Sequence, residues 1–153
     1  MMSLCSDVLN ALQGKTLVTA ESCTGGGIGA ALTAVPGSSE VYKGGIICYT
    51  DWVKENILFV DPAILKEYGA VSAPVAEKLA IGVRRVLQAD IAVSVTGLAG
   101  PGADVYGHEV GTVFIGYADS GRTDIREYHF SGDREQVRMQ AIEAALRLIL
   151  SHV

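Results

Sequence analysis

The chain has 153 residues, of which 49% are hydrophobic and 19% are charged, and its formal net charge at pH 7 is -5. This length and composition predict one domain over residues 1–153 with a substantial core. The acidic balance excludes a general positive field that would hold a nucleic-acid backbone or an anionic membrane. We therefore expect a small-molecule substrate, and neither nucleic acid nor membrane as a partner.

Three cysteines, Cys5, Cys23 and Cys48, are odd in number and irregularly spaced, which argues against a disulfide framework or a closed zinc site. We therefore expect free thiols, a reducing compartment and no metal. The amino terminus lacks the basic segment and apolar run of a signal peptide, and no apolar stretch is long enough to span a bilayer. These features predict a cytoplasmic protein.

The start of the chain carries signals for a helix, a strand and a second helix. Apolar residues at helical spacing over 4–12 predict an opening helix, and the apolar residues 16–20 predict a buried strand. A Gly-rich turn over 21–27 follows, and a helix is predicted over 28–34. This part of the chain is therefore a strand, Gly-rich turn, helix unit.

The middle of the chain adds a second strand and two helices. The apolar residues 45–49 predict a buried strand, and Lys54 falls just beyond its carboxyl end. Asp61 and Ser72 are capping residues placed shortly before a proline, so each predicts the start of a helix.

The last third of the chain adds three strands and a long helix. A third apolar run covers 91–95, and the density of Gly and Pro over 96–102 predicts a loop. Residues 110–118 and 123–130 flank a short turn, which predicts an antiparallel hairpin. Capping-box spacing from Asp133 predicts a closing helix.

Alternating strands and helices with one hairpin predict an α/β fold: a three-layer α/β/α sandwich around a mixed, mostly parallel sheet with one antiparallel hairpin. Ligands of such sheets bind beyond the carboxyl ends of the strands. The loops over 21–27, 49–54 and 96–102 would all lie there, so we expect them to form one pocket.

The Gly-rich segment 24–27 offers backbone N–H groups and the positive end of a helix to a phosphate or an oxyanion. It lacks the lysine that ends a P-loop. The loop over 97–102 has glycines at the wrong spacing for a dinucleotide fingerprint. We therefore expect neither ATP nor NAD, and no cofactor.

Several side chains are candidates for nucleophile and base, and spacing alone leaves each open. Ser22 is either an exposed nucleophile or a helix cap, and Cys23 is either a thiolate nucleophile or a small buried side chain. Only His108 among the histidines lies on a candidate loop, which argues against a Ser-His-Asp triad. Lys54 is either a desolvated base or a solvated helix charge.

Segments along nearly the whole chain resemble the CinA C-terminal domain family. The segments that carry the resemblance are 20–26 (AESCTGG), 35–39 (VPGSS), 42–45 (YKGG), Tyr49 with Lys54, 69–72 (GAVS), 95–102 (VTGLAGPG), 110–113 (VGTV) and 130–138 (FSGDREQVR). In longer members this domain follows a molybdopterin-binding-like domain. No such domain accompanies these segments here, so the resemblance implies the stand-alone amidohydrolase form.

The resemblance implies nicotinamide-nucleotide amidase activity, in which the carboxamide of nicotinamide mononucleotide becomes a carboxylate and ammonia is released. It implies a serine nucleophile with a lysine partner at Ser22 and Lys54, supported by hydroxyl groups of Tyr49 and Thr96. We expect the nucleotide substrate to contact residues of the same segments, namely Thr24, Gly25, Gly26, Gly45, Gly97, Gly100 and Arg138.

The chain departs from the family pattern at Thr50-Asp51, where Ser-Asn is common, and at His108-Glu109, where Lys-Pro is common. The second change replaces a cation by a carboxylate, which weakens the case for a phosphorylated substrate. Two other functions stay open: a catalytically silent nucleotide-binding module, and an accessory protein of competence or DNA damage. The patterns leave open whether the chain forms a homo-oligomer.

Overall fold

The computed structural model describes every residue from Met1 to Val153. In chain order the elements are α1 Met2–Ala11, β1 Leu17–Glu21, α2 Gly27–Thr33, the 3-10 helix η1 Ser38–Glu40, β2 Tyr42–Ile47, α3 Asp51–Asn56, α4 Pro62–Tyr68, α5 Ala73–Val86, β3 Ile91–Gly97, β4 Thr112–Ala118, β5 Thr123–His129 and α6 Arg134–Leu150.

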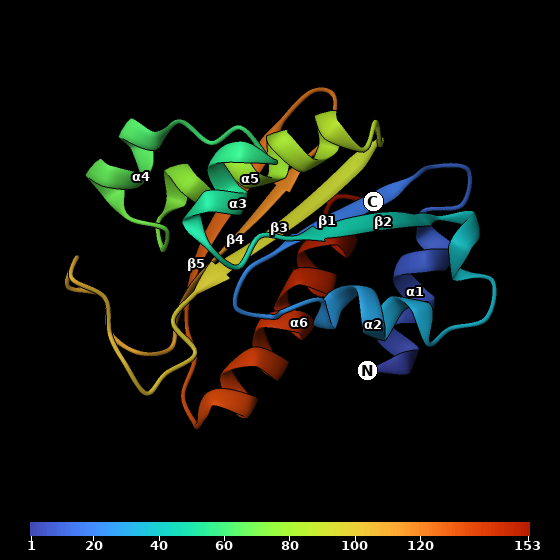
Figure 1. The fold of residues 1–153 in the computed structure, drawn as a ribbon. Coiled ribbons are helices and arrows are strands. Elements are labelled where there is room, and N and C mark those ends of the chain that lie inside the picture. Colours follow the sequence, from blue (N-terminus) through green and yellow to red (C-terminus); the bar gives the residue numbers. More distant parts are fainter.

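The five strands form one sheet in the order β2-β1-β3-β4-β5 (Figure 1). β1 pairs in parallel with β2 and β3, whereas β4 is antiparallel to both β3 and β5, so only β4 runs against the other strands. The whole of β1 is buried, because a central strand with helices on both faces has no solvated side. The carboxyl ends of β1, β2 and β3 therefore lie at one edge of the sheet.

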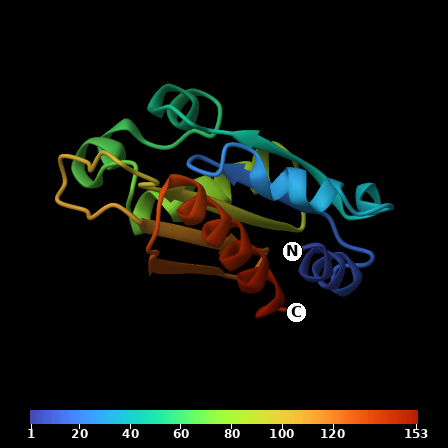
Figure 2. The ribbon, with the colours of Figure 1, turned by 90° about the horizontal axis from the view of Figure 1, so that it is seen from below.

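Helices cover both faces of the sheet, as Figure 1 and Figure 2 show together. α1, α2 and α6 pack on one face, in a core that includes Leu32, Val93 and Leu146. α5 packs on the other face with α3 and α4 nearby, in a core that includes Val18 and Leu79. The predicted three-layer α/β sandwich around a mixed sheet is confirmed.

The predicted strands are confirmed, with differences at their ends. β2 begins at Tyr42 rather than at residue 45, and it stops at Ile47. β3 continues through Gly97, where a loop from residue 96 was expected. Gly97 stays in the sheet because it pairs with Val113, and a side chain at position 97 would collide with β4. The backbone partner therefore overrides the local tendency of glycine to break a strand.

The short helix α3 was not predicted from the patterns along the chain. It begins after Thr50, whose side-chain oxygen accepts a hydrogen bond from the backbone N–H of Val53. Lys54 therefore lies on a helix, and its burial separates it from an ordinary solvated helix charge.

The predicted closing helix is confirmed as α6, and Asp133 and Gln136 form the predicted capping box at its start. The loop over 98–111, drawn in yellow to orange, extends from the edge of the sheet where β3 ends (Figure 1). No helix combines the length and the apolar character that crossing a membrane requires.

Candidate active site

The candidate site lies where β1 and β2 end side by side. The chain leaves β1 toward α2 on one face of the sheet and leaves β2 toward α3 on the other face. Loops that diverge in this way open a crevice at the carboxyl ends of the strands. Ser22 directly follows β1, and Lys54 reaches it from α3.

The side chains of Ser22 and Lys54 meet inside the protein. Nζ of Lys54 lies 3.1 Å from Oγ of Ser22, 2.7 Å from the carbonyl oxygen of Cys48 and 3.3 Å from that of Tyr49. Lys54 is 1% exposed and Ser22 is 7% exposed. No carboxylate pairs with the amine, so neutral oxygen atoms are its only hydrogen-bond partners.

Burial lowers the pKa of Lys54, because loss of water destabilises the ammonium form more than the neutral amine. The nearby Cys48 and Asp51 groups act in the opposite direction and offset part of this shift. A lysine in such surroundings is predisposed to act as a proton acceptor.

A cavity of about 370 Å³ opens beside this pair, a volume within the range of small-molecule sites. The loops that follow β1, β2 and β3 contribute to its wall together with α6. The lining residues are Ser22, Cys23, Tyr49, Asp51, Lys54, Ala70, Val71, Thr96, Gly97, Leu98, Ala99, Gly100, Gly102 and Arg134. The three loops expected to form one pocket do so.

The predicted site residues fall into two groups. Those that line the cavity are Ser22, Tyr49, Lys54, Thr96, Gly97 and Gly100. Those outside its wall are Thr24, Gly25, Gly26, Gly45 and Arg138. Within the first group, the hydroxyl of Thr96 donates a hydrogen bond of 2.8 Å to the carbonyl of Ala70, so it fixes the loop before α5 to β3.

Glu21, which the sequence patterns did not single out, holds the start of α2. Its buried carboxylate accepts hydrogen bonds from the backbone N–H groups of Ile28 and Gly29 at 2.7 and 3.1 Å, and from the hydroxyl of Thr24 at 2.8 Å. Glu21 therefore places a carboxylate of the chain itself at the start of α2, where the helix end was expected to attract a phosphate. It occupies the N–H groups of Ile28 and Gly29, which follow the segment 24–27. The sequence signal was an acidic residue at the first position of the Gly-rich turn.

Replacing Glu21 with glutamine is expected to lower the free energy of unfolding by about 2 kcal/mol, because an amide NH₂ would then face a backbone N–H in the buried cap. Urea denaturation measures this change. The matched control is Glu40→Gln, at an exposed position of η1, which should leave stability within about 0.5 kcal/mol of the parent. Equal effects of the two substitutions would show that the cap contributes nothing special.

Arg138 of α6 was expected to contact the substrate, but a different arginine of α6 lines the cavity. The guanidinium of Arg138 donates to the carbonyls of Cys23 and Thr24 at 3.0 and 3.2 Å, so it braces the turn after Ser22 from behind. Arg134 lines the cavity instead, where it donates to the carbonyl of Gly100 at 2.6 Å and to the hydroxyl of Tyr49 at 3.3 Å. The cation that faces the cavity is thus Arg134.

Gly45 and His108 also lie away from the cavity wall. Gly45 sits in the middle of β2 beside Thr19, and a side chain there would collide with Thr19 and Tyr42. Its lack of a side chain therefore serves packing. The ring of His108 lies 2.7 Å from the carboxylate of Asp104 within the loop over 98–111, so the structure gives it no contact with Ser22.

Cys23 lines the cavity, and burial raises the pKa of its thiol to about 11. Burial likewise raises the pKa of Cys48 to about 11. Both cysteines are free, as expected, and both are thiols rather than thiolates at neutral pH. This weakens Cys23 as a rival nucleophile to Ser22.

The family model for the CinA C-terminal domain matches residues 2–153. The chain belongs to this family. A CinA-like protein of Geobacter sp. is 43% identical over 140 residues, which cover 92% of this chain and 34% of that protein. One from Thermosynechococcus vestitus is 46% identical over 138 residues, which cover 88% of this chain and 33% of that protein. The chain thus spans about a third of the length of these relatives.

Solved CinA-family structures share the fold along the whole CinA C-terminal domain. The competence damage-inducible protein A of Klebsiella pneumoniae is 35% identical with a TM-score of 0.95, and the match covers 99% of this chain and 97% of that one. The competence/damage inducible protein CihA of Agrobacterium tumefaciens is 33% identical with a TM-score of 0.95, over 98% of this chain and 93% of that one.

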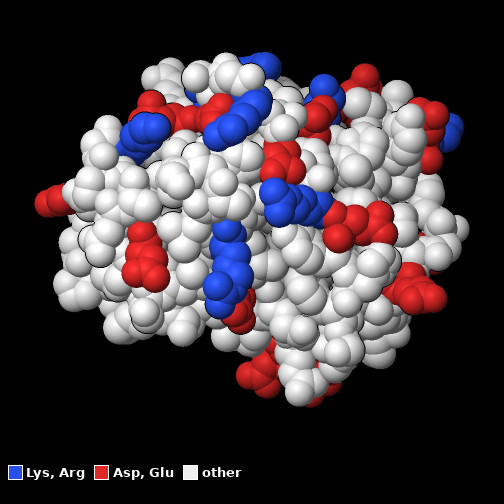
Figure 3. Space-filling view, turned by 180° about the vertical axis from the view of Figure 1, so that it is seen from behind, with Lys and Arg blue, Asp and Glu red and all other residues white.

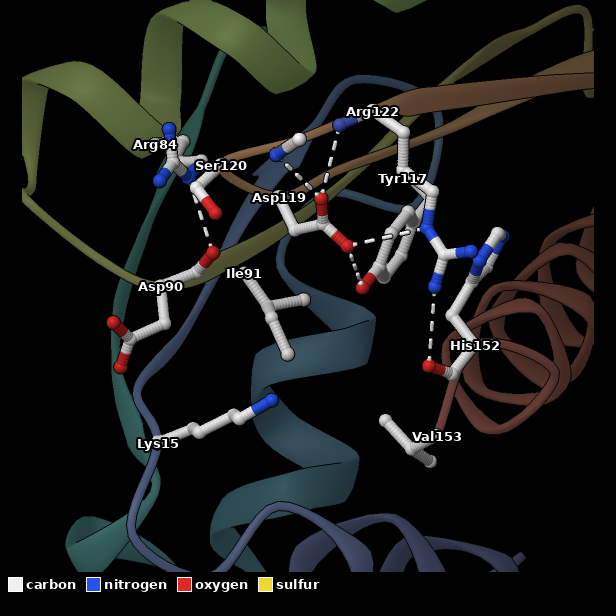
Figure 4. Close-up of a pocket in the computed structure, with 11 residues that line it drawn as sticks. Lys15, Arg84, Asp90, Ile91, Tyr117, Asp119, Ser120, Arg122, His152 and Val153 are labelled. Atoms are coloured by element: carbon white, nitrogen blue, oxygen red, sulfur yellow. Dashed lines mark hydrogen bonds and ion pairs between the residues drawn. The ribbon is translucent and has the colours of Figure 1, made fainter.

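This CinA domain has a second hollow, of about 420 Å³, at the opposite edge of the sheet, near the starts of β1 and β3 (Figure 4). The carboxylate of Asp119 lies at its centre and accepts a hydrogen bond of 2.9 Å from the hydroxyl of Tyr117. Ser120 has no base as a hydrogen-bond partner, and no three His, Cys, Asp or Glu side chains are grouped as metal ligands in the chain. The cavity beside Ser22 therefore remains the candidate active site.

Proposed function

We propose that this CinA domain hydrolyses the carboxamide of nicotinamide mononucleotide to give nicotinate mononucleotide and ammonia, with Ser22 as nucleophile and Lys54 as its base. The observation that carries the proposal is the 3.1 Å contact between Nζ of Lys54 and Oγ of Ser22, both buried beside the cavity. The family resemblance supports the substrate, and the buried pair supports the chemistry.

The three oxygen atoms around Nζ of Lys54 can each accept an N–H of the ammonium, and the same positions also accommodate the neutral amine that the proposed mechanism needs. A neutral amine has two N–H groups and one lone pair, and the structure offers Nζ three partners. The carbonyl oxygens of Cys48 and Tyr49 can only accept, so they take the two N–H groups. In the neutral amine the lone pair then accepts a hydrogen bond from the hydroxyl of Ser22. The proton of that hydroxyl is the one that a base must remove.

The proposed reaction has two stages. Oγ of Ser22 attacks the carboxamide carbon while its proton passes to Nζ of Lys54, and Lys54 then gives that proton to the amide nitrogen as the C–N bond breaks and ammonia leaves. Lys54 next takes a proton from water, which attacks the ester between Ser22 and the nicotinoyl group. Lys54 returns this proton to Oγ of Ser22 as the ester C–O bond breaks, which releases nicotinate mononucleotide and restores both side chains, so water is the only co-substrate that the balance needs.

Backbone N–H groups beside Ser22 support stabilisation of the tetrahedral oxyanion. The N–H groups of Cys23 and Thr24 donate to no acceptor in the chain, whereas that of Gly25 donates to the carbonyl of Ser22. Free donors next to a nucleophile form an oxyanion hole when they face the developing charge. Each such donor lowers the activation barrier by about 3 kcal/mol in comparable enzymes.

Arg134 supports binding of the substrate phosphate. Its guanidinium lines the cavity and pairs with no carboxylate, and a carbonyl and a tyrosine hydroxyl hold it in place. A planar guanidinium held in this way suits the oxygens of a phosphate.

The proposal is tested by incubating the purified protein with nicotinamide mononucleotide and measuring ammonia against nicotinate mononucleotide. We expect the two products in equal amounts. Binding of the nucleotide without ammonia would instead identify a catalytically silent nucleotide-binding module, the main alternative.

The names of the solved relatives refer to competence and DNA damage, which raises DNA binding as a further alternative. The net charge of -5 opposes it. On the face turned away from the view of Figure 1, basic and acidic side chains are interspersed and form no basic band (Figure 3). Tight, salt-dependent binding to DNA in a gel-shift titration would revive this alternative.

Replacing Cys23 with alanine is expected to keep ammonia release within about twofold of the parent, because a thiol with a raised pKa supplies almost no thiolate at neutral pH. Steady-state rates at pH 7 measure the effect. A loss comparable to that of a Ser22 variant would favour a thiolate mechanism.

A further inference from the structure

Asp51 is the one carboxylate in the wall of the candidate cavity. It lies in the first turn of α3, and its side chain makes neither a hydrogen bond nor an ion pair. Its charge nevertheless reaches the site, because it acts on Lys54 against the effect of burial. An unpaired carboxylate that faces a cavity favours a ligand that carries positive charge there.

The other charges of the cavity restrict where that positive charge would lie. Lys54 already contacts Ser22 and two carbonyl oxygens. Arg134 is the other basic residue in the wall, and its hydrogen bonds go to neither Ser22 nor Lys54. The cavity thus offers an unpaired carboxylate and a guanidinium in the same wall. A ligand with one cationic and one anionic group complements both.

We propose that Asp51 is a specificity-determining residue that selects a positively charged ring, so that the cavity prefers pyridinium nucleotides to their uncharged dihydro forms. This inference rests on the proposed function. Nicotinamide mononucleotide carries a positive ring and a negative phosphate. Its dihydro form keeps the carboxamide and the phosphate but has a neutral ring. The ring of Tyr49, in the same wall, adds an aromatic face to which a cation is attracted.

A purely structural role for Asp51 has a different signature. An acidic residue in the first turn stabilises a helix whatever ligand is present. Loss of that effect would lower the free energy of unfolding and would weaken the binding of both ligands alike. Selection of a charged ring changes the ratio of the two affinities, which is the quantity to measure.

Isothermal titration calorimetry with nicotinamide mononucleotide and its dihydro form tests the inference on the parent, Asp51→Asn and Glu55→Gln. The substitution Glu55→Gln removes a carboxylate from the same helix at a position outside the cavity wall, so it is the matched control. We expect the parent to favour the cationic form, Asp51→Asn to weaken only that form by about fivefold, and Glu55→Gln to retain the preference. Raising the salt concentration should reduce the preference of the parent.

An unchanged affinity ratio in Asp51→Asn, no preference in the parent, or no binding of either form would overturn the inference. Ammonia release is measured on the same proteins to separate the two proposals. A charge preference that depends on Asp51 in a protein that releases no ammonia would refute the hydrolysis and leave the inference standing. Ammonia release with an unchanged ratio would have the reverse meaning.

Discussion

Replacing Ser22 with alanine is expected to lower ammonia release from nicotinamide mononucleotide by about 10⁴-fold or more, the size of effect that loss of a nucleophile has in hydrolases. The substitution removes one oxygen atom, so the fold and the cavity should persist. Steady-state measurement of ammonia detects the loss. Mass spectrometry of the parent after rapid acid quenching should detect the nicotinoyl ester, and Ser22→Ala should lack it.

Ser120→Ala is the matched control, because Ser120 is exposed in the turn between β4 and β5 at the opposite edge of the sheet. It should retain the parent rate. Calorimetry should show that Ser22→Ala still binds the nucleotide, which separates loss of chemistry from loss of the site. Substantial ammonia release by Ser22→Ala together with its loss in Cys23→Ala would replace the proposed nucleophile.

The elements that the sequence predicted are those with strong periodicity or strong caps. The buried run before Ser22, the capping box at Asp133 and the hairpin follow local rules, and the structure confirms them. The start of α3 depends on a single weak cap at Thr50, at 3.5 Å, in a segment too short to show a period. The end of β3 at Gly97 depends on its partner strand, which local patterns do not contain.

The contact between Ser22 and Lys54 joins side chains 32 residues apart, so spacing alone left each open and the family resemblance selected both. The choice between Arg134 and Arg138 shows a limit of the same kind. Residues four apart lie on one face of a helix, and which of them reaches a cavity depends on how that helix crosses the sheet. Likewise Glu21 is the last residue of β1, but its role as a cap appears only when α2 packs beside it.

Replacing Lys54 with arginine is expected to lower turnover by about 1,000-fold, within the range that general-base catalysis contributes. A guanidinium keeps the positive charge but does not release a proton in the accessible pH range, so it cannot accept the proton of Ser22. Lys54→Met removes the amine with less change in bulk, and it should lose turnover equally. Lys66→Arg, at an exposed position on α4, is the matched control and should retain the parent rate.

The pH profile of the parent gives the sign of the effect. Burial lowers the pKa of Lys54, so kcat/KM should rise with pH as the amine loses its proton. The midpoint of this rise should lie below about pH 10.4, the ordinary pKa of lysine. The lowered pKa also means that the unfolded chain binds the extra proton more readily, so the contribution of Lys54 to stability rises with pH through the same window. Near-normal turnover in Lys54→Arg, with an unchanged profile, would identify Lys54 as a binding cation and place the base elsewhere.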